Sequence, residues 1–139
     1  MAVVVRVPAH YALTRNALEA GKHVYCEWPL GANLKETEEL ASLARQKGVH
    51  TMVGLQRRAS PTYLRLKELV AEGYVGQVLA VNLTQMGSGV QTRTADRTWQ
   101  RDATLGANTM TIGFGHSIDA LCMVVGEITE VSGVVSTQV

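Results

Sequence analysis

Three short apolar segments alternate with two helical patterns over the first 56 residues, and this alternation limits the possible folds more than any other feature. Residues 2–7 are a run dominated by valine, and residues 23–27 and 50–55 are two further short apolar segments. Residues 11–20 and 33–47 space their apolar side chains for one buried helix face. The order β-α-β-α-β predicts a parallel sheet with right-handed crossovers, and we expect its first strand to be buried on both faces.

Two helices carry their own boundary signals. Asn33 is a good N-cap for the helix over residues 33–47, and Gly48 suits its C-terminal end. Ser60 and Pro61 open a third helix, in which Pro takes the first helical position, and this helix runs to about residue 71.

The pattern changes after Gln56. Residues 77–86 and 130–139 alternate in polarity, which predicts strands. Residues 91–102 are polar and predict a loop with one or two helical turns, whereas residues 106–125 contain an apolar helix. We therefore expect an α/β fold over residues 1–56, followed by an α+β region over residues 57–139.

The composition excludes several classes of protein. The net charge is +1, which gives no electrostatic basis for nucleic-acid binding, and no apolar run approaches the roughly 20 residues of a membrane span. The histidines show no ligand spacing, so no metal site is predicted. Cys26 and Cys122 lie far apart in apolar segments, which is typical of reduced thiols in a cytoplasmic protein.

A Glu-Trp-Pro corner follows the second predicted strand. Glu27 would stand at the carboxyl end of that strand, where ligands bind in α/β sheets. Equally, Glu27 either caps the next helix or is solvated. His10 stands where the first strand gives way to a helix, and a solvated or helix-capping role is the favoured interpretation.

A second chemical signal lies at the start of the apolar helix. His116 and Asp119 are three residues apart and so share a helix face. A carboxylate there can orient an imidazole for proton transfer. The alternative is an Asp that interacts favourably with the helix dipole next to a structural His.

Taken in order, several segments resemble the glucose-fructose oxidoreductase and inositol dehydrogenase family (Gfo/Idh/MocA). They are Glu27-Trp28-Pro29, residues 53–58 (Val-Gly-Leu-Gln-Arg-Arg), Pro61, residues 73–78 (Gly-Tyr-Val-Gly-Gln-Val), Gly106 and residues 116–119 (His-Ser-Ile-Asp). The resemblance implies that residues 1–56 are the second half of a Rossmann-type sheet. Residues 57–139 would then begin an α+β domain with an open mixed sheet. It further implies an NAD- or NADP-dependent oxidoreductase that acts on a sugar or cyclitol alcohol.

The chain departs from the family pattern at two catalytic positions. Trp28 replaces the usual Lys of the corner, and Ile112 replaces an Asp that often precedes the His by four residues. These variants resemble a branch that includes the galactose-regulon repressor, a member that senses rather than catalyses. Two hypotheses therefore stand: an oxidoreductase, and a non-catalytic ligand-binding regulator of the same fold.

The resemblance also assigns candidate roles. His116 would be the catalytic proton acceptor, Arg58 and Asp119 would bind substrate, and Trp28–Pro29 is a candidate cis peptide. The candidate cofactor contacts are Pro8, His10, Glu27, Trp28, Pro29 and Gln56.

No Gly-x-Gly-x-x-Gly turn is present, so we expect the chain to be a fragment that binds NAD(P) weakly or not at all. We also expect a homo-oligomer, because incomplete sheets leave apolar strand edges without neighbours.

Overall fold

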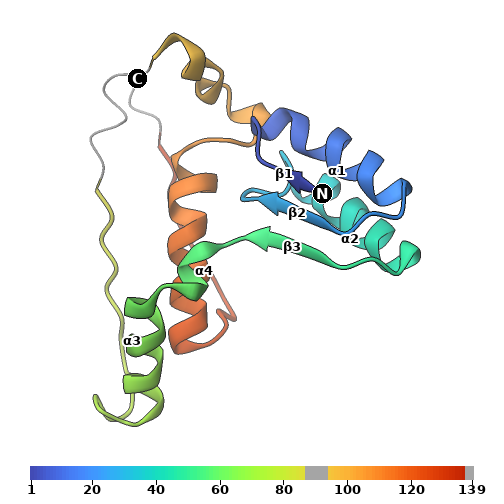
Figure 1. The fold of residues 1–139 in the computed structure, drawn as a ribbon. Coiled ribbons are helices and arrows are strands. Elements are labelled where there is room, and N and C mark those ends of the chain that lie inside the picture. Colours follow the sequence, from blue (N-terminus) through green and yellow to red (C-terminus); the bar gives the residue numbers. More distant parts are fainter. Residues whose placement is uncertain (87–93, 137–139) are drawn as a thin grey trace.

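A small parallel sheet forms the N-terminal part of the molecule. The computed structural model describes residues 1–86 and 94–136. Its strands are β1 (Ala2–Val3), β2 (Val24–Glu27) and β3 (Thr51–Gly54), and they lie in the order β1-β2-β3 (Figure 1). Both pairings are parallel, with Val3 opposite Cys26 and Cys26 opposite Val53. This arrangement confirms the predicted α/β fold with a parallel sheet.

The first strand is much shorter than the sequence predicts. Pairing of β1 ends at Val3 opposite Cys26, one residue before β2 itself ends at Glu27. Val4 and Val5 are exposed, so the expectation of a strand over residues 2–7 that is buried on both faces is wrong. The chain turns at once into a short 3₁₀ helix, Val7–Ala9.

Helices α1 (His10–Glu19) and α2 (Leu34–Lys47) pack on one face of the sheet (Figure 1). Leu18 of α1 and Leu40 of α2 meet Val24 and Cys26 of β2 in the buried core. The opposite face is open in the described residues, where Met52 is 66% exposed. The core therefore occupies a single layer between the sheet and the two helices.

The boundary signals of α2 act as the sequence predicts. The Asn33 side chain accepts a hydrogen bond from the Glu36 N–H at 3.0 Å, which satisfies an N–H that the helix itself leaves free. Gly48 ends the helix with φ of 62°, a left-handed conformation that glycine adopts without strain.

The C-terminal part is built on two helices that lie side by side, α3 (Pro61–Ala71) and α4 (Gly115–Val125) (Figure 1). A 3₁₀ turn over Gln56–Ala59 connects β3 to α3. A π-helical segment, Thr109–Phe114, leads directly into α4. The bounds of α3 and the apolar helix within residues 106–125 confirm the sequence predictions.

Neither of the two C-terminal strands is formed in the described residues. Residues 77–86 and 127–136 have no regular secondary structure, and residues 137–139 lie outside the described part. Alternation selects a face for a strand, but a strand also needs a hydrogen-bonded neighbour, and the three strands of the N-terminal sheet are the only paired segments described. The prediction of strands over residues 77–86 and 130–139 is therefore wrong for this structure.

The polar segment between these regions contains the expected helical turns. A 3₁₀ helix spans Ala95–Arg101 and a second spans Ala103–Leu105, whereas residues 91–93 of the predicted loop lie outside the described residues. Across residues 1–86 and 94–136, no helix combines the length and apolar character that crossing a membrane requires.

Candidate functional site

The corner after β2 sits beside the start of α4. The Trp28–Pro29 peptide bond is cis, as predicted. The Trp28 Nε1–H donates a 2.6 Å hydrogen bond to the Thr111 carbonyl in the π-helical segment. Gly115, the first residue of α4, lies against the indole ring. The carboxyl end of the sheet and the amino end of α4 therefore meet at Trp28.

His10 lies beneath this corner and is completely buried. Its Nδ1 is 2.7 Å from the Pro29 carbonyl oxygen, and its Nε2 is 2.9 Å from the Val5 carbonyl oxygen. The Glu27 carboxylate approaches Nε2 at 3.5 Å. A solvated or capping role for His10, which its place before a helix favoured, is therefore wrong, because contacts distant in sequence enclose the ring.

His116 lies in the first turn of α4, directly after Gly115. Burial lowers the pKa of its imidazole below the usual 6.5, the positive charge of Arg57 lowers it further, and Asp119 acts in the opposite direction. The Nδ1 atom is buried and has no hydrogen-bond partner among the described residues. With its pKa below 6.5, the half-buried imidazole is mainly neutral at pH 7 and can accept a proton.

A chain of hydrogen bonds holds Arg57 near His116. The Arg57 Nη1–H donates to Ser117 Oγ at 2.7 Å, and Ser117 Oγ–H donates to Gln85 Oε1 at 2.5 Å. The guanidinium also lies over the Tyr63 ring, 5.9 Å from its centroid. Arg57, Ser117 and Gln85 were not predicted from the sequence. Arg57 and Ser117 nevertheless stand in two of the segments that resemble the family, residues 53–58 and 116–119.

Asp119 pairs with Arg58 rather than with His116. The Arg58 Nη2–H and Nε–H donate to the carboxylate at 2.6 and 2.9 Å in a forked arrangement. Among the described residues, no hydrogen bond joins Asp119 to His116. Asp119 influences the imidazole only through its charge, so the expected Asp-oriented histidine is not formed here.

The other predicted cofactor contacts follow the three strands at the same edge of the sheet. Pro8 and Gln56 are exposed, Glu27 and Trp28 are half-buried, and Pro29 is buried together with His10. Four of these side chains are thus accessible at the edge, and two lie beneath it. The assigned cofactor roles stay predictions.

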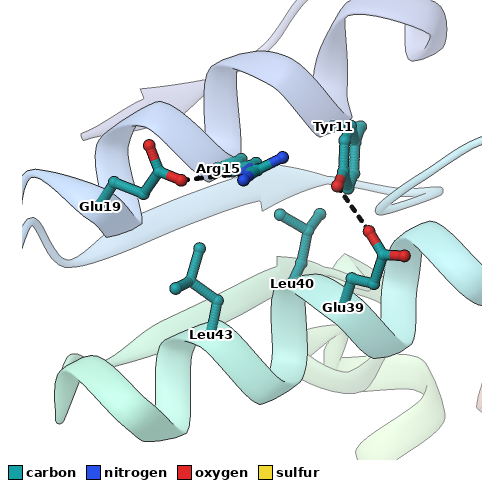
Figure 2. A pocket seen from close by; sticks show the side chains of 6 residues that line it. All are labelled: Tyr11, Arg15, Glu19, Glu39, Leu40 and Leu43. Atoms are coloured by element: carbon teal, nitrogen blue, oxygen red, sulfur yellow. Dashed lines mark hydrogen bonds and ion pairs between the residues drawn. The ribbon is translucent and has the colours of Figure 1, made fainter.

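A separate hollow of about 180 Å³ lies between α1 and α2, away from the corner (Figure 2). The Tyr11 hydroxyl donates to the Glu39 carboxylate at 2.5 Å, and Arg15 pairs with Glu19 at 2.9 Å. Leu40 and Leu43 complete its wall. None of the predicted site residues lines it, and its polar groups are paired with one another, so we assign it no role in the site.

Metal-binding groups are not assembled in the described part of the chain. No cluster of three or more His, Cys, Asp or Glu side chains in residues 1–86 and 94–136 has a geometry that would hold a metal ion. Cys26 is a buried free thiol and Cys122 is a half-buried one.

Two family models match the chain over adjoining ranges. The model described as "Oxidoreductase family, NAD-binding Rossmann fold" matches residues 1–55. The model described as "Gal80p, C-terminal domain" matches residues 61–139.

Similar proteins include both enzymes and a regulator. Dehydrogenase aclE of Aspergillus oryzae is 42% identical over 91% of this chain and 35% of its own length. The crystal structure of the transcriptional regulator Gal80p from Kluyveromyces lactis is 32% identical, with a TM-score of 0.82 over 91% of this chain and 34% of that one. An NAD-binding oxidoreductase from Klebsiella pneumoniae is 26% identical, with a TM-score of 0.71 over 90% of this chain and 34% of that one. The chain spans about a third of the length of these relatives.

Proposed function

Because the chain belongs to the Gfo/Idh/MocA oxidoreductase family with its NAD-binding Rossmann fold, we propose that it supplies the catalytic edge of an NAD- or NADP-dependent dehydrogenase. The substrate would be a sugar-like or cyclitol alcohol, and His116 would accept the hydroxyl proton. The chain spans only about a third of the length of its relatives. The activity of the whole protein is therefore a part of this proposal.

The state of His116 carries the proposal. A group that removes a proton at neutral pH must be unprotonated beforehand, and the lowered pKa of His116 meets this condition. The His116 side chain as a whole is only half-buried, so part of the imidazole stays accessible to a substrate. The nearby cation of Arg57 favours the neutral imidazole and would favour the alkoxide that forms as the substrate hydroxyl loses its proton.

The residues at the sheet edge fit a nicotinamide cofactor. Pro8, Glu27, Trp28 and Gln56 would hold it, because they follow the carboxyl ends of the strands and their side chains are accessible. When bound, the cofactor would supply the hydride acceptor for alcohol oxidation. His10 and Pro29 would support this edge from below rather than touch the cofactor.

The Arg58–Asp119 pair would bind substrate hydroxyl groups. Arg58 is about half exposed and donates to a carboxylate that is itself only 13% exposed, so the pair is fixed at the surface of the junction. A sugar or cyclitol carries several hydroxyls that act both as donors and as acceptors. Substrate recognition by this pair would leave His116 free to take the proton from the reacting hydroxyl.

The domain boundary, location and assembly belong to the same proposal. We place the boundary between residues 56 and 57, at the start of the 3₁₀ turn that follows β3. Free Cys26 and Cys122 support a cytoplasmic location. We also propose a homo-oligomer, because the segments that follow α3 and α4 expose apolar side chains.

Turnover in the presence of a saturating nicotinamide cofactor tests the proposal. The chain is assayed with NAD⁺ and NADP⁺ in the millimolar range against a panel of sugars and cyclitols, because cofactor binding is expected to be weak. Alcohol-dependent reduction of the nicotinamide is the expected result, with a loss of about 100-fold or more in His116→Asn.

His50→Asn is the matched control, since His50 is exposed and lies at the amino end of β3. Equal turnover in His116→Asn and in the unchanged chain would refute the role of His116. Saturable sugar or nucleotide binding without any turnover would favour the regulator.

One observation favours that second function. Trp28 stands where the family's Lys would act, and its only polar side-chain atom is already bonded to the Thr111 carbonyl. Trp28 therefore cannot supply the proton that a Lys would, which suits a ligand-binding regulator. A ligand-dependent change in partner binding, with no turnover, is the expected result under this alternative.

A further inference from the structure

Both ring nitrogens of His10 face carbonyl oxygens. Nδ1 lies 2.7 Å from Pro29 O, and Nε2 lies 2.9 Å from Val5 O. A backbone carbonyl can only accept hydrogen bonds, and a neutral imidazole has one N–H group. A neutral His10 would therefore leave one nitrogen lone pair directed at an oxygen lone pair in a site closed to water.

We infer that His10 is a doubly protonated imidazolium that ties the loop after β1 to the corner after β2 and so positions Trp28. One N–H donates to Val5 O on the first loop, and the other donates to Pro29 O immediately after Trp28. His10 is a positioning residue in this scheme, since its ring is completely buried beneath the edge where the cofactor is proposed to bind.

The surroundings of the ring supply the counter-charge that a buried cation needs. Among the described residues, the ionisable groups that interact with the ring are Cys26 and Glu27, both on β2. The loops that hold Val5 and Pro29 contribute carbonyl oxygens. The Glu27 carboxylate, 3.5 Å from Nε2, is the anionic partner.

The proton on His10 is held over the physiological range. Burial lowers the pKa of the imidazole, but the influence of the Cys26 side chain and the hydrogen bonds to Pro29 O and Val5 O outweigh burial and raise the pKa to about 9. Both hydrogen bonds therefore join the two loops at neutral pH. One of the two is lost when the imidazolium loses a proton in alkaline solution. The value of this positioning for catalysis rests on the proposed function, whereas the protonation state does not.

Nitrogen NMR on the full chain tests the protonation state directly. Long-range correlations from the carbon-bound ring protons report both nitrogens of each histidine in a ¹⁵N-labelled sample. We expect both His10 nitrogens to have protonated shifts at neutral pH and to change only near pH 9. One protonated and one bare nitrogen at neutral pH would overturn the inference.

The His10 signals can be assigned in two ways. They disappear in His10→Gln, which keeps one amide donor for one of the two carbonyls. If that variant does not fold, single His→Gln changes at His23, His50 and His116 assign the remaining three of the four histidines, and His10 follows by elimination.

A second reading in the same titration tests the positioning role. The ring C–H signals of Trp28 should shift with the same midpoint as His10, because Pro29 adjoins Trp28. Trp99, in the 3₁₀ helix Ala95–Arg101, is the control and should not follow that midpoint. Trp28 signals that stay constant while His10 titrates would overturn the positioning role. Neither reading needs cofactor, substrate or turnover, so inactivity of the chain would leave both conclusions intact.

Discussion

Gly115 lies so close to the indole of Trp28 that a Cβ atom on Gly115 would be 2.6 Å from Trp28 Nε1 and 2.7 Å from its Cζ2. Real Cβ atoms essentially never approach other atoms this closely, so any larger residue at this position would force the indole or α4 to shift. The backbone of Gly115 is ordinary right-handed helix. The requirement for glycine at this position is therefore one of space and not of conformation.

Gly115→Ala should destabilise the chain by about 1–3 kcal/mol, the usual cost of overpacking. Helix propensity alone would make the Ala variant more stable by roughly 1 kcal/mol. A lower free energy of unfolding would therefore identify the contact with Trp28 as the cause. The measurement is the free energy of unfolding from urea titration. Gly133→Ala is the control, since a Cβ atom added there would have nothing within 4 Å. A variant as stable as the unchanged chain would show that the indole moves aside freely.

The stability of the chain should fall as the pH rises from 6.5 to 9. His10 has a pKa of about 9 in the folded chain and 6.5 when unfolded, so the folded state binds the proton more tightly between these values. The stabilisation is complete below pH 6.5, and about 3 kcal/mol is lost once the pH passes 9. Urea midpoints measured across this range should show the decline in the unchanged chain and in His50→Gln, but not in His10→Gln. Parallel curves for all three chains would contradict the prediction.

The pKa of His116 should respond in opposite directions to its two charged neighbours. Arg57→Gln removes a positive charge and should raise the pKa, whereas Asp119→Asn removes a negative charge and should lower it further. NMR titration of the His116 ring protons gives both values. His23 is the internal control, because it lies at the other end of the sheet, before β2. A pKa above 6.5 in the unchanged chain would contradict the assigned burial and charge effects.

The chain should associate through the two extended segments, residues 77–86 and 127–136. Leu79 is 87% exposed and Val131 is 89% exposed, and such apolar surface favours burial against another copy. Sedimentation equilibrium at micromolar concentration should give a mass well above that of a single chain, and Leu79→Glu with Val131→Glu should reduce it.

Leu34→Glu controls for a general effect of added charge, since Leu34 is also exposed but lies on α2. A single-chain mass before any substitution would exclude this association.

Local chemistry made much of the fold predictable. Asn33, Gly48 and Pro61 determine helix ends through contacts within a few residues, and each acts where the sequence places it. The parallel sheet follows from the alternation of strands and helices. The strands expected over residues 77–86 and 130–139 failed because pairing depends on a neighbour that an alternating pattern does not provide.

The site was less predictable, because its contacts join distant segments. The position of His10 before a helix suggested solvation, yet its ring bonds with Pro29, 19 residues away. The spacing of His116 and Asp119 suggested a pair, yet Arg58 takes the carboxylate from 61 residues away. Helix periodicity places His116 and Asp119 on one face. It does not show that a side chain from a distant segment, Arg58, pairs with the carboxylate.

The contacts that join α4 to the rest of the chain also predict an order of folding events. Trp28 bonds with Thr111 across 83 residues, and Arg57 bonds with Ser117 across 60. Closing such loops costs more entropy than forming the contacts among α1, α2 and the sheet, which join segments closer in sequence. We expect the sheet and its two helices to assemble first and α4 to dock late, with Trp28 already in place as its template. Substitutions at this junction should therefore speed unfolding and leave the rate of folding nearly unchanged.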